Sequence, residues 1–242
     1  MKIEGRNAVA EAIKSGKTID RLVVSKDVKD AGGNRIIADA KSRNIKIMFY
    51  DKAVLDRESE SKRHQGFIAE ITDYKYSSVE EILAYAEEKD EKPFIIIVDG
   101  VEDPHNLGSI IRVADCAGCH GVIIPRHRNV TVNETVIKVS AGAASHVKVA
   151  KVTNVNDAID YLKQQNVWVY AAELGGDDIY KANLTGAIAI VVGGEGKGVS
   201  KLTKQKCDGV VTLPMRGQVN SLNASVAAGI VAYEYVRQNF AK

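Results

Sequence analysis

A carboxylate between glycines is the first group in this sequence that could do chemistry. Glu195 lies in AIVVGGEGKGVSKL (189–202), where an apolar run ends in a glycine-rich stretch. A phosphate-binding P-loop is excluded because Lys197 is followed by Gly198 and not by a hydroxyl residue, and the dinucleotide fingerprint fails at Val199. Glu195 is either a hydrogen-bond acceptor or counter-charge beside a ligand, or an exposed turn residue.

A second set of polar residues follows another apolar run, in VDGVEDPHNLGSIIRVADCAG (98–118). It contains Asn106 and Arg112 on an expected helix at 106–117. Six residues do not place two side chains on adjacent turns of one helix face. We therefore expect Asn106 at the mouth of the helix, as a cap or a functional group, and Arg112 nearly two turns further and pointing elsewhere.

The third set is in VTLPMRGQVNSLNASVAAGIVAYEYV (211–236). Ser221 and Asn223 open a helix expected near 221–240 that is rich in small residues. Either alone would be an ordinary N-cap. Together with Asn220 they exceed what one helix start requires, so a binding role is favoured.

Regular alternation of strands and helices positions these three sets. Apolar runs predict strands at 94–100, 121–125, 147–152, 167–173, 187–194 and 209–214, with further helices at 133–141, 155–165 and 200–206. Near-continuous Val and Ile runs are typical of a parallel sheet covered on both faces. Ligands of such sheets bind beyond the carboxyl ends of the strands, where all three sets fall.

The remaining N-terminal part predicts a separate domain. Residues 1–72 alternate helix and strand, beginning with a helix at 5–16 that Gly16 ends, and carry 15 Lys and Arg against 11 Asp and Glu. Residues 73–92 carry 3 against 7 and contain a capping box, Ser78 with Glu81, so they predict an acidic linker helix. We expect a small α/β domain at 1–72, a linker at 73–92 and an α/β parallel-sheet domain at 93–242.

The composition indicates the cellular compartment of the protein. No apolar run approaches membrane-spanning length, and the start of the chain lacks a signal-peptide core. Three cysteines are too few for a disulfide framework, which favours a cytoplasmic protein. Cys116-Ala-Gly-Cys119-His120 matches a haem-attachment pattern, but without a secretory signal we interpret the cysteines as small packing residues and expect no metal.

Together, DPHNLGSIIRVADCAG, VVGGEGKGVS and LPMRGQVNSLNASVAAGI, in this order, resemble the SpoU (TrmH-type) RNA 2′-O-ribose methyltransferases of the SPOUT superfamily. The expected domain at 1–72, which contains GRNAVAEAI and His64-Gln65-Gly66-Phe67, resembles the L30e-like substrate-binding domain of rRNA-modifying members. The resemblance implies a deep trefoil knot in the C-terminal domain, a homodimer, and S-adenosylmethionine as cofactor without a metal.

By motif matching, the resemblance also implies roles for individual residues. The implied catalytic group is Asn106, Arg112, Glu195, Ser221 and Asn223. The implied cofactor-binding positions are Ala171, Ala172, Gly193, Gly194, Gly196, Leu213, Met215, Ser221 and Leu222. The expected RNA-binding residues are Arg6, Lys62, Arg63, His64, Gln65 and Arg112, with a solvated loop as the alternative for 62–65.

The expected reaction is methylation of a ribose 2′-hydroxyl, most specifically of a guanosine in 23S rRNA. Arg112 is either the base or, because a guanidinium stays protonated, a phosphate-binding group that lowers the pKa of the hydroxyl. Three alternatives are a tRNA 2′-O-methyltransferase, a non-catalytic RNA-binding paralogue and a nucleotide-dependent oxidoreductase. The intact polar residues disfavour the second, and Val199 disfavours the third.

Overall fold

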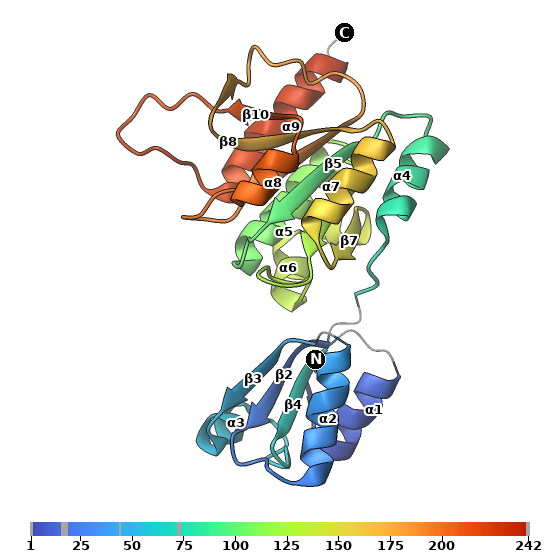
Figure 1. The fold of residues 1–242 in the computed structure, drawn as a ribbon, viewed down its shortest axis with the longest axis vertical. Coiled ribbons are helices and arrows are strands. Elements are labelled where there is room, and N and C mark those ends of the chain that lie inside the picture. The colour runs from blue at the N-terminus through green and yellow to red at the C-terminus, as the bar shows by residue number, and fades with distance from the viewer. Residues whose placement is uncertain (1, 16–18, 44, 72–73, 241–242) are drawn as a thin grey trace. The chain divides into compact units, whose positions relative to one another are not determined.

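The computed structural model describes residues 2–15, 19–43, 45–71 and 74–240, which form two compact units, 1–75 and 76–242 (Figure 1). The predicted helix end at Gly16 and the predicted boundary at 72/73 lie outside the described residues. Each unit is described by itself below.

Unit 1 is a mixed sheet with helices on both faces. Its strand order is β1 (Lys2–Glu4), β4 (Phe67–Ile71), β2 (Ile19–Ser25), β3 (Ile47–Tyr50), and only the β2–β3 pair is parallel. Alternate residues of β2 face opposite sides. Leu22 and Val24 pack in the same core as α1 (Arg6–Lys14) and α2 (Ala31–Ser42), whereas Val23 packs with Leu55 of α3 (Lys52–Glu58). The sequence did not predict β1.

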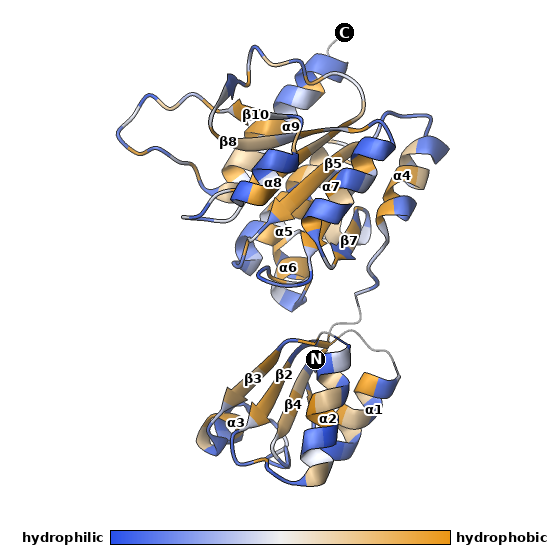
Figure 2. Ribbon diagram, in the orientation of Figure 1, coloured by the Kyte–Doolittle hydropathy of each residue, from blue (hydrophilic) through white to orange (hydrophobic). Residues whose placement is uncertain are grey.

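Unit 2 contains a parallel sheet, as predicted. The order is β10 (Gly209–Thr212), β8 (Trp168–Asp178), β9 (Ile188–Gly193), β5 (Phe94–Asp99), β6 (Gly121–Pro125), β7 (Lys148–Val152), and every pair of neighbours is parallel. Figure 2 shows β5 as a hydrophobic strand. The central strands β5, β9 and β6 are strongly apolar and buried along nearly their whole length. Their near-continuous Val and Ile runs are explained by burial on both faces.

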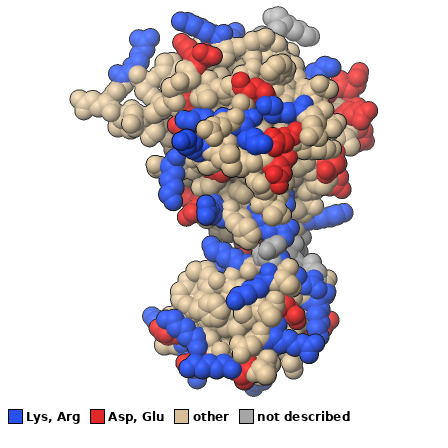
Figure 3. Space-filling model, viewed as in Figure 1, with Lys and Arg blue, Asp and Glu red and all other residues tan. Residues whose placement is uncertain are grey.

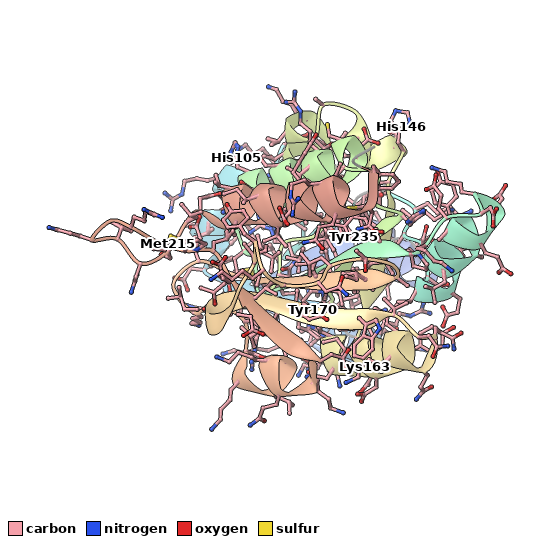
Figure 4. The ribbon with its side chains drawn as sticks, turned by 90° about the horizontal axis from the view of Figure 1, so that it is seen from above. His105, His146, Lys163, Tyr170, Met215 and Tyr235 are labelled. Atoms are coloured by element: carbon pink, nitrogen blue, oxygen red, sulfur yellow. The ribbon has the colours of Figure 1, made fainter. Side chains whose placement is uncertain are left out.

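Two helical layers cover this sheet. On one side α4 (Val79–Glu88), α7 (Val155–Gln164) and α8 (Lys201–Lys206) pack over a core that includes Ile82, Ile159 and Val199. On the other side lie α5 (Pro104–Cys116), α6 (Glu134–Val139), a short 3₁₀ helix (Ala143–Ser145) and α9 (Ala224–Phe240). Figure 4 shows both layers, with His105 of α5 on one side and Lys163 of α7 on the other.

The acidic helix α4 is part of unit 2. Ser78 and Glu81 form the capping box, and Ile82 packs where Gly121 leaves room, since a Cβ on Gly121 would lie 2.5 Å from Ile82 Cδ1. Ser77 adds a parallel bridge to Ala150 at the sheet edge. The residues predicted as a linker therefore extend the core of the C-terminal unit.

The end of β8 departs from regular pairing. Ala171 lies opposite Val210 of β10, but the next β10 residue, Val211, lies opposite Asp177, so residues 172–176 bulge away from β10. Thr212 Oγ1 donates to Glu173 O at 2.7 Å and accepts from Gly176 N at 2.7 Å. The hydroxyl of Thr212 thereby closes the bulge.

The cysteines of unit 2 differ in their burial. Burial raises the pKa of the Cys119 thiol well above its ordinary value, consistent with a packing residue, but the packing interpretation is wrong for Cys116, which is exposed. Among the described helices, none combines the length and apolar character that crossing a membrane requires. The described part of the chain also holds no cluster of three His, Cys, Asp or Glu side chains suited to a metal.

Candidate active site

A cavity of about 670 Å³ lies at the carboxyl ends of β8, β9 and β10. Its wall combines the bulge of β8, the glycine turn after β9 and the loop between β10 and α9. Met215 belongs to that loop, which projects from the unit (Figures 1 and 4). Because the sheet is parallel, the predicted site motifs meet at this edge.

Two glycines of the turn 193–198, Gly193 and Gly194, lie too close to other backbone to carry a side chain. A Cβ on Gly194 would lie 2.0 Å from Gly100 O, and one on Gly193 would lie 2.1 Å from the carbonyl carbon of Gly198. Gly196 has a φ of 79°, a left-handed conformation that glycine adopts readily. The turn therefore holds Glu195 at a fixed position above β5 and β9.

Three side chains from three motifs form one hydrogen-bonded cluster. Asn106 Nδ2 donates to Glu195 Oε1 at 2.9 Å, and Asn223 Nδ2 donates to Glu195 Oε1 at 2.8 Å and to Asn106 Oδ1 at 2.9 Å. Glu195 Oε2 has no hydrogen-bond partner among the described residues. The cluster thus presents an oriented carboxylate oxygen as an acceptor.

Helix starts position both asparagines. Asp103 caps α5 through the His105 N–H, and Pro104 occupies the first turn. Asn106 therefore lies in the first turn of the helix and is 5 % exposed, so of the two alternatives, a cap or a functional group, the cap is wrong. Asn223 does cap α9, because its Oδ1 accepts from the N–H groups of Ser225 and Val226 while its Nδ2 binds the cluster.

Arg112 is not part of this cluster. It is exposed on α5, next to Val113, which faces Gly229 of α9. This agrees with the expectation that Arg112 points away from Asn106. Within one chain, the five residues implied as catalytic therefore fall into the hydrogen-bonded trio, Ser221 on the cavity wall, and Arg112 elsewhere.

Most of the implied cofactor positions line the cavity, namely Ala172, Gly193, Gly194, Gly196, Leu213, Met215, Ser221 and Leu222. Ala171 does not, because its side chain is fully buried in the core on the other side of β8. Asn220, whose role the sequence left open, lines the wall. Sequence reasoning missed Glu173, Leu174, Val192, Lys197, Gly198, Val211, Ala224 and Ala227.

In unit 1, the expected RNA-binding loop is held by internal contacts. His64 is 4 % exposed, with Nε2 2.8 Å from Asp56 Oδ1 and Nδ1 accepting from Gly66 N. Arg6 makes a bidentate pair with Asp30. His64 and Arg6 thus make contacts within unit 1, and the RNA-binding role of the expected residues stays a prediction. Lys62, Arg63 and Gln65 are exposed. Figure 3 shows that Lys and Arg side chains are frequent on one face of unit 1.

Glu4 anchors the first part of this loop. Burial alone would raise the pKa of Glu4, but hydrogen bonds from the Ser61 and Ser59 hydroxyls and the Glu60 and Ser61 N–H groups lower it to about 2. A carboxyl whose pKa is depressed on folding stabilises the fold above its unfolded value of 4.5. This stabilisation is lost as the pH falls toward 2.

We expect Glu4→Gln to remove much of this pH dependence. Hydrogen exchange of the amides at 59–61 in the full chain should accelerate between pH 5 and about 2.5 relative to the intrinsic rates. The variant should show fast exchange already at pH 5 and a smaller change with pH. Glu11→Gln, which changes an exposed glutamate of α1, is the matched control. Equal pH profiles for wild type and Glu4→Gln would contradict the anchoring role.

Comparisons with known proteins agree with this architecture. The profile of the SpoU rRNA methylase family matches residues 93–233, and that of the RNA 2′-O-ribose methyltransferase substrate-binding domain matches residues 2–77. A Bacillus subtilis protein named in the TrmH family of tRNA/rRNA methyltransferases is 40% identical over 97% of this chain and 94% of its own. A Staphylococcus aureus protein of the same name is 43% identical over 98% and 95%.

Solved structures show the same fold. The SpoU methyltransferase AviRb of Streptomyces viridochromogenes, crystallised with AdoMet, has a TM-score of 0.62 at 21% identity and covers 98% of this chain and 90% of its own. The TrmH/SpoU tRNA-modifying enzyme of A. aeolicus has a TM-score of 0.56 at 28% identity over 61% of this chain and 76% of its own. With two matched domains and full-length relatives, this chain belongs to the SpoU family of RNA methyltransferases.

Proposed function

We propose that this protein transfers the methyl group of S-adenosylmethionine to a ribose 2′-hydroxyl of RNA. The observation that carries the proposal is the Asn106–Glu195–Asn223 cluster beside the cavity, formed by three motifs that are far apart in sequence. An RNA-binding paralogue without activity would not need this arrangement.

The cavity fits the proposed cofactor in size and chemistry. Its volume of about 670 Å³ is in the range of small-molecule sites. Val192, Leu213, Met215 and Leu222 supply apolar surface for an adenine ring, and the glycine turn exposes backbone polar groups. When bound, S-adenosylmethionine supplies an electrophilic methyl group on a positively charged sulfur. AviRb, a member of the same family, was crystallised with this cofactor.

The polar cluster would orient the acceptor ribose. Glu195 Oε2 can accept a hydrogen bond from a hydroxyl, and the asparagine amides fix the carboxylate so that the acceptor is held in one direction. Holding a nucleophile at attack distance contributes several kcal/mol to catalysis, roughly 7 or more in favourable cases. Arg112 has two candidate roles, as the base or as a cation that binds the neighbouring phosphate and lowers the pKa of the hydroxyl. Because a guanidinium stays protonated, the second role is favoured.

A homodimer would give Arg112 access to a cavity. Exposed apolar side chains recur every seventh residue along α9, at Val226, Tyr233 and Phe240, which are 49 %, 52 % and 58 % exposed. Residues at this spacing share one helix face, and such a stripe is suited to association. We infer that two copies associate through this side of unit 2 and that Arg112 of one copy serves the cavity of the other. The trefoil knot and the L30e-like character of unit 1 stay predictions.

We propose 23S rRNA as the target, with a guanosine as the methylated nucleotide and tRNA as the alternative. Support comes from the rRNA methylase profile on unit 2 and the substrate-binding profile on unit 1. Relatives are named for both tRNA and rRNA, so the target needs a direct test.

Mapping ribose methylation on rRNA and tRNA, with and without the gene, tests the function. We expect one 2′-O-methyl mark on 23S rRNA to vanish in the deletion strain and to return when the purified protein and S-adenosylmethionine are added to the unmodified rRNA. Loss of a tRNA mark alone would overturn the rRNA assignment. An unchanged methylation map, with no transfer in vitro, would overturn the enzymatic proposal itself.

A further inference from the structure

The cavity wall includes a glutamate, Glu173, that lies outside the three motifs that the sequence singled out. Glu173 lies on the wall of the cavity, in the bulge of β8, and Glu195 on the glycine turn lines the same cavity. Its Oε2 accepts from Val199 N at 2.8 Å, and its Oε1 accepts from Leu174 N at 3.0 Å. The carboxylate therefore joins the end of β8 to the end of the glycine turn.

The surrounding structure fixes this carboxylate from several sides. A Cβ on Gly198 would lie 2.1 Å from Glu173 Oε2, so only glycine lets the carboxylate approach the turn. The Glu173 carbonyl accepts from Thr212 Oγ1, and Gly176 lies so close to β10 that its Cβ would be 2.2 Å from Val210 O. The backbone that carries Glu173 is thus held by β10 while its side chain is held by the turn.

The charge of the cavity wall has a consequence for binding. Its ionisable side chains are Glu173, Glu195 and Lys197, so two carboxylates face one ammonium. Glu195 already accepts two amide hydrogen bonds through one oxygen, and Glu173 accepts two backbone N–H groups. These donors hold both carboxylates in place on the cavity wall.

We infer that Glu173 is a specificity residue that favours the sulfonium cofactor over its thioether product. This inference rests on the proposed function. S-adenosylmethionine and S-adenosylhomocysteine differ by a methyl group and by the positive charge on sulfur. A fixed carboxylate on the cavity wall attracts the charged ligand and gives no such advantage to the neutral sulfur. Product then leaves more readily than cofactor, which keeps turnover from being limited by product inhibition.

Glu173→Gln separates this charge effect from the structural one. The amide oxygen of glutamine can still accept the Val199 N–H, so the turn is retained while the charge is removed. Calorimetric titration of the full chain with each ligand should show the Kd for S-adenosylmethionine rising about three- to tenfold in the variant. The Kd for S-adenosylhomocysteine should stay within about twofold.

Asp177→Asn is the matched control, because it removes one negative charge from the same strand outside the cavity wall. Its ratio of the two Kd values should equal that of the wild type. An unchanged ratio in Glu173→Gln, or an equal change in Asp177→Asn, would overturn the inference. Failure of the wild type to bind either ligand would instead overturn the proposed function, so the two failures are distinguishable.

Discussion

Arg112→Ala is expected to lower the rate of RNA methylation about a hundred- to a thousandfold while S-adenosylmethionine binds as in the wild type. Arg112 is exposed on α5 and does not line the cavity, so its removal leaves the cofactor wall intact. The loss arises because a cation beside the reacting ribose stabilises the developing alkoxide. Single-turnover methylation and calorimetric titration measure the two effects separately.

Two further variants test the role of the Arg112 side chain. Arg112→Lys keeps the charge but not the planar bidentate geometry, so we expect partial activity if the residue binds a phosphate. Lys181→Ala removes another exposed cation and should methylate at the wild-type rate. Robust methylation by Arg112→Ala would remove Arg112 from the mechanism.

Arg112→Ala, combined with a second variant, also tests whether Arg112 acts across a homodimer. Asn223→Ala breaks the cluster and caps α9 poorly, so it too should be nearly inactive. If Arg112 serves the partner's cavity, a mixed dimer of the two variants has one complete site. Refolded equimolar mixtures should then recover about a quarter of wild-type activity, since half of the dimers are mixed. No recovery would place Arg112 at the cavity of its own chain.

The secondary structure of unit 2 was predictable because its signals are local. The central strands of the sheet are apolar runs, and the capping box of Ser78 and Glu81 lies at the start of its helix. The position of the site followed from parallel topology alone. The separation of Asn106 from Arg112 also followed from helix geometry, since six residues turn the helix well past one face.

Features that depend on long-range contacts were not predictable. The bulge at 172–176 requires the Thr212 hydroxyl and the close approach of Gly176 to Val210, and it decides that Glu173 reaches the glycine turn. Ala172 lines the cavity and Ala171 does not, because the Ala171 side chain is on the face of β8 that meets the core. The sequence alone did not show which face that is. Likewise, His64 and Arg6 have residue types common in RNA sites, but Asp56 and Asp30 bind them inside unit 1.

Gly194→Ala is expected to damage the site severely although it adds only one methyl group. A Cβ there would lie 2.0 Å from Gly100 O and 2.7 Å from its carbonyl carbon, and both are backbone atoms that cannot turn aside. Gly194 N also donates to Asp99 O at 3.0 Å, so the turn is tied to β5 at this point. The turn must shift, and Glu195 then loses its alignment with Asn106 and Asn223.

We expect Gly194→Ala to weaken S-adenosylmethionine binding at least about tenfold and to lower the free energy of unfolding by about 2 kcal/mol, the usual cost of overpacking. Titration and urea denaturation measure these effects, and circular dichroism shows whether the variant is folded. Gly217→Ala, in the loop that leads to α9, is the matched control because a Cβ there has no atom within 4 Å. It should bind and unfold like the wild type. Wild-type affinity in a folded Gly194→Ala protein would mean that the cofactor does not depend on the close packing of this turn against β5.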